Sequence, residues 1–124
     1  MWDPNKIELP ESIKVLNNNT FIKHDIKSII IPNNFTKISG FAFLGCSLLT
    51  NITIPNTITE ICVSTFSGCS SLTNITIPNC VTEIDSYAFY QCSSLTNIAI
   101  PNSVTEICED SFSPNCKIVK MKSI

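Results

Sequence analysis

A repeat of 23 residues is the feature that most constrains this chain. The segments that begin at Leu49, Leu72 and Leu95 are LTNITIPNTITEICVSTFSGCSS, LTNITIPNCVTEIDSYAFYQCSS and LTNIAIPNSVTEICEDSFSPNCK. Ile26 begins a more divergent copy, IKSIIIPNNFTKISGFAFLGCSL. A fixed period of roughly 20–50 residues indicates a solenoid or another repeat array, because one unit cannot bury its own apolar side.

The flanking segments match the repeat less closely. Before Ile26, a unit that is one residue shorter keeps apolar residues at the same positions, among them Ile7, Leu16 and Phe21. At the other end, we expect Ile118 to take the leucine position of a half unit, 118–124. The prediction is one domain, 1–124, with about five units that begin near residues 3, 26, 49, 72 and 95.

Each unit is expected to contain short strands and turns. Ile75 and Ile77 alternate with polar residues, and this period of two predicts a short strand with one buried side. Pro78 ends that strand because proline donates no ladder hydrogen bond. A second extended piece follows around Ile84, and the Phe-to-Cys spacing within 86–92 favours a helical or 3₁₀ turn. The predicted fold class is an α/β repeat solenoid, a coil of short parallel strands with short helical or 3₁₀ turns.

Stacking of the units would place each apolar side chain on its counterpart in the next turn. One repeat position predicts an aromatic column through the core, formed by Phe21, Phe43, Phe66, Phe89 and Phe112. Another predicts a buried column of cysteines, Cys46, Cys69 and Cys92. The chain has seven cysteines, and an odd number at period-locked positions does not suggest a disulfide framework.

The repeat pattern L-x-x-I-x-I-P-x-x-[VI]-x-x-I-x-x-x-x-F-x-x-C-x-x resembles the BspA-type leucine-rich repeats. It is present as Leu72, Ile75, Ile77, Pro78, Val81, Ile84, Phe89 and Cys92. The resemblance covers nearly the whole chain and implies a leucine-rich-repeat coil that acts as a non-enzymatic protein–protein interaction module. Members of this family are surface or secreted binding proteins, so it also implies cell-surface adhesion or binding of host proteins. An intracellular scaffold or adaptor with the same solenoid fold is the alternative.

Uncharged side chains on the first strand of each unit form the candidate binding surface. They align from one unit to the next as Asn51, Thr53, Asn74, Thr76 and Asn97. One interpretation is purely structural, because threonine suits strands and asparagine ladders stack well in parallel coils. The other is that a protein partner binds this face, since solenoids bind through extended surfaces.

A row of acidic residues forms a second candidate surface: Glu60, Glu83 and Glu106. Duplication of the repeat alone would preserve such a row, although stacked like charges repel one another. The alternative is an acidic strip for a basic partner. Binding of a divalent cation is a weaker interpretation, because no loop supplies the additional oxygens that Ca²⁺ prefers.

Composition and motifs argue against other functions. The net charge of −2 and the absence of a basic stripe disfavour nucleic-acid binding. No apolar run approaches the ~18 residues of a membrane helix, and residues 1–10 lack an apolar signal core. His24 is the only histidine, and the chain has no C-x-x-C pair or Gly-rich phosphate loop. We therefore expect no catalytic residue, metal or cofactor, and no membrane insertion.

The end of the repeat array suggests one further interaction. The last unit lacks an obvious polar cap, so the sheet edge there is expected to be exposed. End-to-end association with a second copy is one way to cover that edge.

Overall fold

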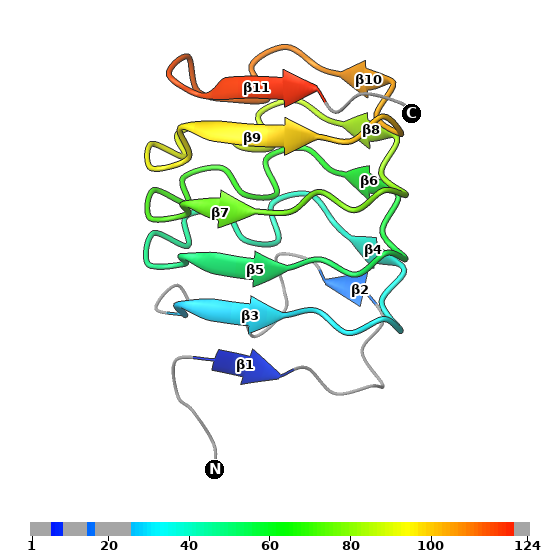
Figure 1. Ribbon diagram of the computed structural model, residues 1–124. Helices are drawn as coiled ribbons and strands as arrows, with labels where there is room; N and C mark the ends of the chain where they lie inside the picture. The colour runs from blue at the N-terminus through cyan, green and yellow to red at the C-terminus, as the bar shows by residue number, and fades with distance from the viewer. Residues whose placement is uncertain (1–5, 9–14, 17–25, 121–124) are drawn as a thin grey trace.

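The computed structural model describes residues 6–8, 15–16 and 26–120 of the chain. Its first strands are β1 (Lys6–Glu8), β2 (Val15–Leu16), β3 (Ser28–Ile30), β4 (Lys37–Ile38), β5 (Asn51–Thr53) and β6 (Glu60–Ile61). The later strands are β7 (Asn74–Ile75), β8 (Glu83–Ile84), β9 (Asn97–Ile100), β10 (Glu106–Ile107) and β11 (Lys117–Lys120). Figure 1 shows these strands stacked along one axis, from β1 at the bottom to β11 at the top.

Each turn of the coil has three sides. The odd-numbered strands form sheets in the order β1-β3-β5-β7 and β11-β9. The even-numbered strands form sheets in the order β2-β4 and β10-β8-β6 on a second side (Figure 1). A stretch of turns without strands closes the third side, and about four turns of this parallel solenoid are described. Within that part, no helix is long and apolar enough to cross a membrane.

A proline corner joins the two strands of each unit. The backbone N–H of the third residue after each proline donates to the proline carbonyl, at 3.1–3.2 Å. Proline suits this position because it fixes its own φ and ends the ladder of the first strand. The residues that donate these bonds occupy one repeat position, and all are buried: Phe35, Ile58, Val81 and Val104.

The strand register confirms the 23-residue period. Ile29 pairs with Ile52, and Ile52 pairs with Ile75. The phenylalanine column is also confirmed over the described residues, because successive rings stack with centroids 5.2–5.4 Å apart and planes within 12° of parallel. The predicted first member, Phe21, lies outside the described residues.

The cysteine column lies in the core, as predicted. Cys46, Cys69 and Cys92 are each at most 1% exposed. The Cys92 thiol donates to the carbonyl of Phe66 at 3.1 Å, and the Cys69 thiol donates to the carbonyl of Phe43 at 3.3 Å. The thiols of Cys69 and Cys92 therefore each connect their own turn to the turn before it.

The helical part of the predicted fold class is not confirmed, because the described residues contain no α-helix and no 3₁₀ helix. The third side consists of turns interrupted by left-handed residues at two repeat positions. The first position is Phe41, Ser64, Tyr87 and Asp110, and the second is Gly45, Gly68 and Gln91, with φ between 52° and 79°. A residue with positive φ cannot continue a right-handed helix.

The backbone of the third side is instead linked from turn to turn. The N–H of Phe43 donates to the carbonyl of Thr65 at 2.9 Å, and the N–H of Phe66 donates to the carbonyl of Ala88 at 2.8 Å. These bonds satisfy buried backbone groups that a helix would have paired locally.

The register of β11 corrects the expected position of Ile118. Ile118 pairs with Ile98 on β9, so it takes the position of a strand isoleucine and not that of the repeat leucine. Lys117 pairs with Asn97. Lys117 follows the phenylalanine of its unit, Phe112, by five residues, whereas Asn97 follows Phe89 by eight residues. The last unit is therefore three residues shorter than the 23-residue units.

A candidate binding surface on the first strand of each turn

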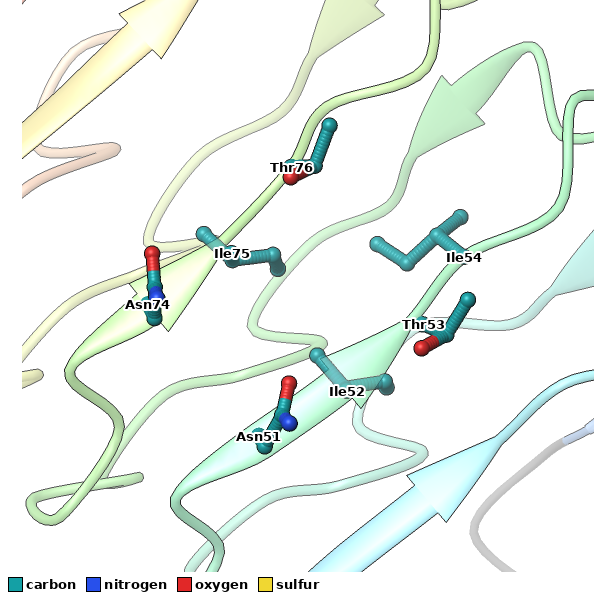
Figure 2. A pocket seen from close by; sticks show the side chains of 7 residues that line it. All are labelled: Asn51, Ile52, Thr53, Ile54, Asn74, Ile75 and Thr76. Carbon is teal, nitrogen blue, oxygen red and sulfur yellow. The ribbon is translucent and has the colours of Figure 1, made fainter.

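The exposed side of β3, β5, β7 and β9 forms a surface that we call the strand face. Along β5, the side chains of Asn51 and Thr53 are exposed, whereas Ile52 between them is buried. The later turns repeat this alternation, since Asn74, Thr76 and Asn97 are all exposed. Figure 2 shows that Asn51 and Asn74 lie in parallel on adjacent strands, and that Thr53 and Thr76 form a second row beside them. The structure thus brings together the uncharged residues that the sequence predicted to align.

The asparagine side chains of the strand face are not occupied by hydrogen bonds within the described part of the protein. None of the amides of Asn51, Asn74 and Asn97 forms a hydrogen bond with another described residue. An asparagine ladder stabilises a coil through amide-to-amide hydrogen bonds between turns, and the described residues show no such bonds. The amides consequently present one acceptor and two donors each to the outside.

The strand face is hollowed between its strands. A hollow of about 240 Å³ lies between β5 and β7, and its wall includes Ile54 and Ile75. A larger hollow of about 350 Å³ lies between β7 and β9. Ala99 lines the larger hollow at the position that threonine occupies in the two preceding turns, and its smaller side chain leaves more room. The face therefore has open hollows between its rows of hydrogen-bonding groups, lined by asparagine, threonine and mostly buried isoleucine.

The acidic row occupies a different surface. Glu83 pairs in register with Glu60 on one side and with Glu106 on the other, across β6, β8 and β10. These strands lie on the second side of the coil (Figure 1). The structure therefore does not unite the acidic row with the strand face into one site.

Asp85 lies beside the acidic row, although it was not among the residues predicted to form that row. Carboxylate oxygens of Glu60, Glu83 and Asp85 all lie within 4.8 Å of one another. Partial desolvation raises the pKa of Glu83, and the neighbouring carboxylates of Glu60 and Glu106 raise it further, as does Asp85. The sequence spacing of two residues between Glu83 and Asp85 could have predicted this position of Asp85, because residues with that spacing project from the same side of an extended chain. Three carboxylates are fewer ligands than the six to eight oxygens that Ca²⁺ typically takes.

Comparison with known sequences decides the family. A sequence model of the BspA-type leucine-rich-repeat region matches residues 3–123 with six copies of the repeat. The chain belongs to the BspA-type leucine-rich-repeat family. This family assignment supports a protein-interaction module, and neither the family nor the fold provides evidence of catalysis. No curated protein matches this BspA-type chain.

Solved structures of bacterial leucine-rich-repeat proteins share the fold of this BspA-type chain. A leucine-rich cell surface protein of Faecalibacterium prausnitzii is 34% identical, with a TM-score of 0.86 over 98% of this chain and 33% of its own. A leucine-rich-repeat protein of Bacteroides ovatus is also 34% identical, with a TM-score of 0.71 over 77% of this chain and 25% of its own. The T. pallidum leucine-rich-repeat protein is 32% identical, with a TM-score of 0.70 over 73% of this chain and 42% of its own. The BspA-type chain thus spans less than half the length of each of these proteins.

Proposed function

We propose that this chain binds a protein partner through the strand face, as part of cell-surface adhesion or binding of a host protein. The observation that carries the proposal is the set of free asparagine amides, which stand in register on adjacent turns. Hydrogen-bonding groups that have no partner among the described residues are available to pair with a peptide backbone. The adjacent hollows give the face relief into which side chains of a partner can fit, next to the hydrogen-bonding groups.

The proposed location at the cell surface is supported by the description of a similar protein. The similar protein of Faecalibacterium prausnitzii is described as a cell surface protein. A stack of identical turns offers an extended surface rather than a closed pocket, which suits recognition of another macromolecule.

An intracellular scaffold is the second candidate, and the state of the cysteines favours it. All seven cysteines are free thiols, and Cys80 is exposed. Exposed free thiols are more typical of a reducing compartment. Surface biotinylation of intact source cells distinguishes the two locations, because only a surface protein is labelled before the cells are broken.

The binding experiment uses a double substitution on the strand face, Asn74→Arg with Thr76→Arg. The immobilised chain is first exposed separately to an extracellular-matrix extract and to a cell lysate, and each retained protein is then purified. Biolayer interferometry should show that the double variant weakens a partner at least tenfold, since bulky charges would cover the amides and the hollows. Because both altered side chains are exposed, the variant should keep the wild-type far-UV circular dichroism spectrum and melting temperature.

The control adds the same charge at another exposed place. Asn56 and Thr59 lie outside the strand face, and both are exposed. Asn56→Arg with Thr59→Arg should bind the partner as the wild type does. Unchanged binding by the Asn74 and Thr76 variant would exclude the strand face as the contact surface.

A further inference from the structure

An aromatic surface lies on the third side of the coil, away from the strand face. Among the described residues, the large apolar side chains most exposed on this side belong to two turns. The first turn contributes Phe41, Leu44 and Leu48, with exposures of 43%, 45% and 46%. The second contributes Tyr87 and Tyr90, with exposures of 43% and 38%. We call these five residues the aromatic patch.

The repeat explains why the two halves of the patch are close. Phe41, Ser64 and Tyr87 share one repeat position, and the turns that carry them are neighbours. The N–H of Phe41 donates to the carbonyl of Val63 at 3.1 Å, and the N–H of Ser64 donates to the carbonyl of Ser86 at 3.0 Å. Only one turn therefore separates the two halves, or roughly 10 Å at the spacing of adjacent strands.

Small hydroxyl side chains lie between the two halves. Ser64 and Ser67 take the places that Tyr87 and Tyr90 take one turn later, and each is only 8% exposed. No hydrogen bond joins their hydroxyl groups to another described residue. The hydroxyls of these two serines thus sit between larger apolar side chains without a partner in the described part of the fold.

In the described part of the chain, the only charges beside the patch are negative. Segments 39–48 and 62–71 contain no Asp, Glu, Lys, Arg or His, whereas the corresponding segment 85–94 begins with Asp85, and exposed Asp110 takes the repeat position of Tyr87 in the following turn. The other polar neighbours of the patch are exposed or half-buried hydroxyl and amide side chains, namely Ser47, Ser70, Ser71, Gln91, Ser93 and Ser94. An anionic partner would lose its hydration here and gain no opposite charge.

The size of the patch limits the partner. With about 200 Å² for a fully exposed large side chain, exposures near 40% give roughly 400 Å² for five residues. A stable protein dimer buries about 800 Å² on each partner, so the patch is too small to hold a second copy firmly. Exposed apolar patches of roughly 300–600 Å² on monomers are nevertheless often functional.

We propose that the aromatic patch binds a neutral oligosaccharide. A sugar ring presents an apolar C–H face that stacks on an aromatic ring, and its edge carries hydroxyl groups that both donate and accept hydrogen bonds. Tyr87 and Tyr90 supply two rings whose centroids lie 5.3 Å apart at an interplanar angle of 84°. Their phenol groups and the surrounding serines supply hydrogen-bonding partners, and the carboxylates of Asp85 and Asp110 beside the patch disfavour an anionic ligand.

The chain itself supplies a substitution that should not disturb the fold. Tyr87 has φ 58°, and Ser64 has φ 52° at the same repeat position. Tyr87→Ser with Tyr90→Ser therefore converts one turn into the serine pattern of the turn before it. The variant removes both rings while keeping residue types that this backbone already accommodates.

The test measures binding of defined neutral probes to the full chain. Four hexasaccharides are titrated into ¹⁵N-labelled protein and followed by NMR: those of α-linked glucose, β-linked glucose, β-linked mannose and β-linked N-acetylglucosamine. At least one should shift the amide signals of 86–94, with a dissociation constant of roughly 0.1–10 mM, corresponding to a weak site. Tyr87→Ser with Tyr90→Ser should weaken that binding at least tenfold, whereas Asn56→Arg with Thr59→Arg should not.

Three results would overturn the proposal. One is that none of the four probes shifts the signals of 86–94 at about 10 mM, a concentration that would fill at least about half of a site in the expected range of dissociation constants. Another is that the serine variant binds as the wild type does. The third is that an uncharged proline-rich peptide shifts these signals when no sugar does, which would assign the patch to peptide recognition.

Discussion

The ring of Phe89 lies 5.3 Å from the ring of Phe66, and their planes are 12° apart. Both side chains are 0% exposed. Because Phe112 stacks on the other side of Phe89 at 5.2 Å, Phe89 has an aromatic neighbour on each side. The core of this coil is thus continuous from turn to turn.

Phe89→Ala should lower the free energy of unfolding by about 3–5 kcal/mol, because it leaves a cavity between two rings. Urea denaturation followed by circular dichroism measures this change. Tyr90→Ser is the control, since it alters an exposed side chain in the same turn and should change stability by less than about 0.5 kcal/mol. Equal stability of Phe89→Ala and the wild type would contradict a packed aromatic column.

Gln91→Gly should stabilise the protein by up to about 1 kcal/mol. Gln91 has φ 59°, where Gly45 and Gly68 stand in the preceding turns, and a left-handed conformation costs a non-glycine residue about 1–2 kcal/mol. Part of that gain is lost because glycine is more flexible in the unfolded chain. Gly68→Ala is the opposite change and should destabilise by about 1 kcal/mol. The two urea midpoints should move in opposite directions, and a shift of both in the same direction would refute the strain argument.

The buried cysteines should resist thiol reagents in the folded protein. Burial raises the pKa of Cys46 to about 11 and that of Cys92 to about 12, from an ordinary value of 9.0. At pH 8 almost none of either thiol is ionised, and the thiolate is the reactive form. Peptide mapping after brief alkylation should find exposed Cys80 labelled first, and Cys46 and Cys92 labelled only in urea. Labelling of Cys92 as fast as Cys80 in native protein would show that the column is open to solvent.

Glu83→Gln should raise the melting temperature at pH 7. The pKa of Glu83 is raised in the folded protein, so the folded state holds the proton more tightly than the unfolded chain and its charged form is destabilising. That penalty grows as the pH rises above the ordinary value of 4.5 and disappears below it. The difference between Glu83→Gln and the wild type should therefore be positive at pH 7 and shrink toward pH 4. Exposed Glu109→Gln serves as the control, and a difference that grows toward low pH would refute the repulsion between stacked carboxylates.

Binding through the strand face should depend little on salt. The face carries amides and hydroxyls, whereas the acidic row would attract a basic partner electrostatically. Raising the salt from about 50 to about 500 mM shortens the screening length severalfold and weakens only the second kind of contact. The dissociation constant of a purified partner should change less than about threefold over this range. A much steeper loss of affinity would assign the contact to Glu60, Glu83 and Glu106.

The repeat in the sequence determined the stacking and the core of this protein. Side chains at one repeat position must lie on one another when identical turns stack, so the register from Ile29 through Ile52 to Ile75 could be predicted, as could the phenylalanine and cysteine columns. The alternation of apolar and polar residues also predicted which residues of β5, β7 and β9 would be exposed.

Tertiary structure decided the features that depend on contacts between unlike residues. The third side forms turns instead of helices, and Phe41 and Ser64, both at positive φ, donate their backbone N–H groups to the next turn. Asp85 approaches Glu60 only once adjacent turns are stacked. The shorter last unit aligns Ile118 with Ile98, although the period alone aligned it with a leucine. A repeat specifies what lies above each residue when the units are equal, but departures from the repeat are resolved by packing between turns.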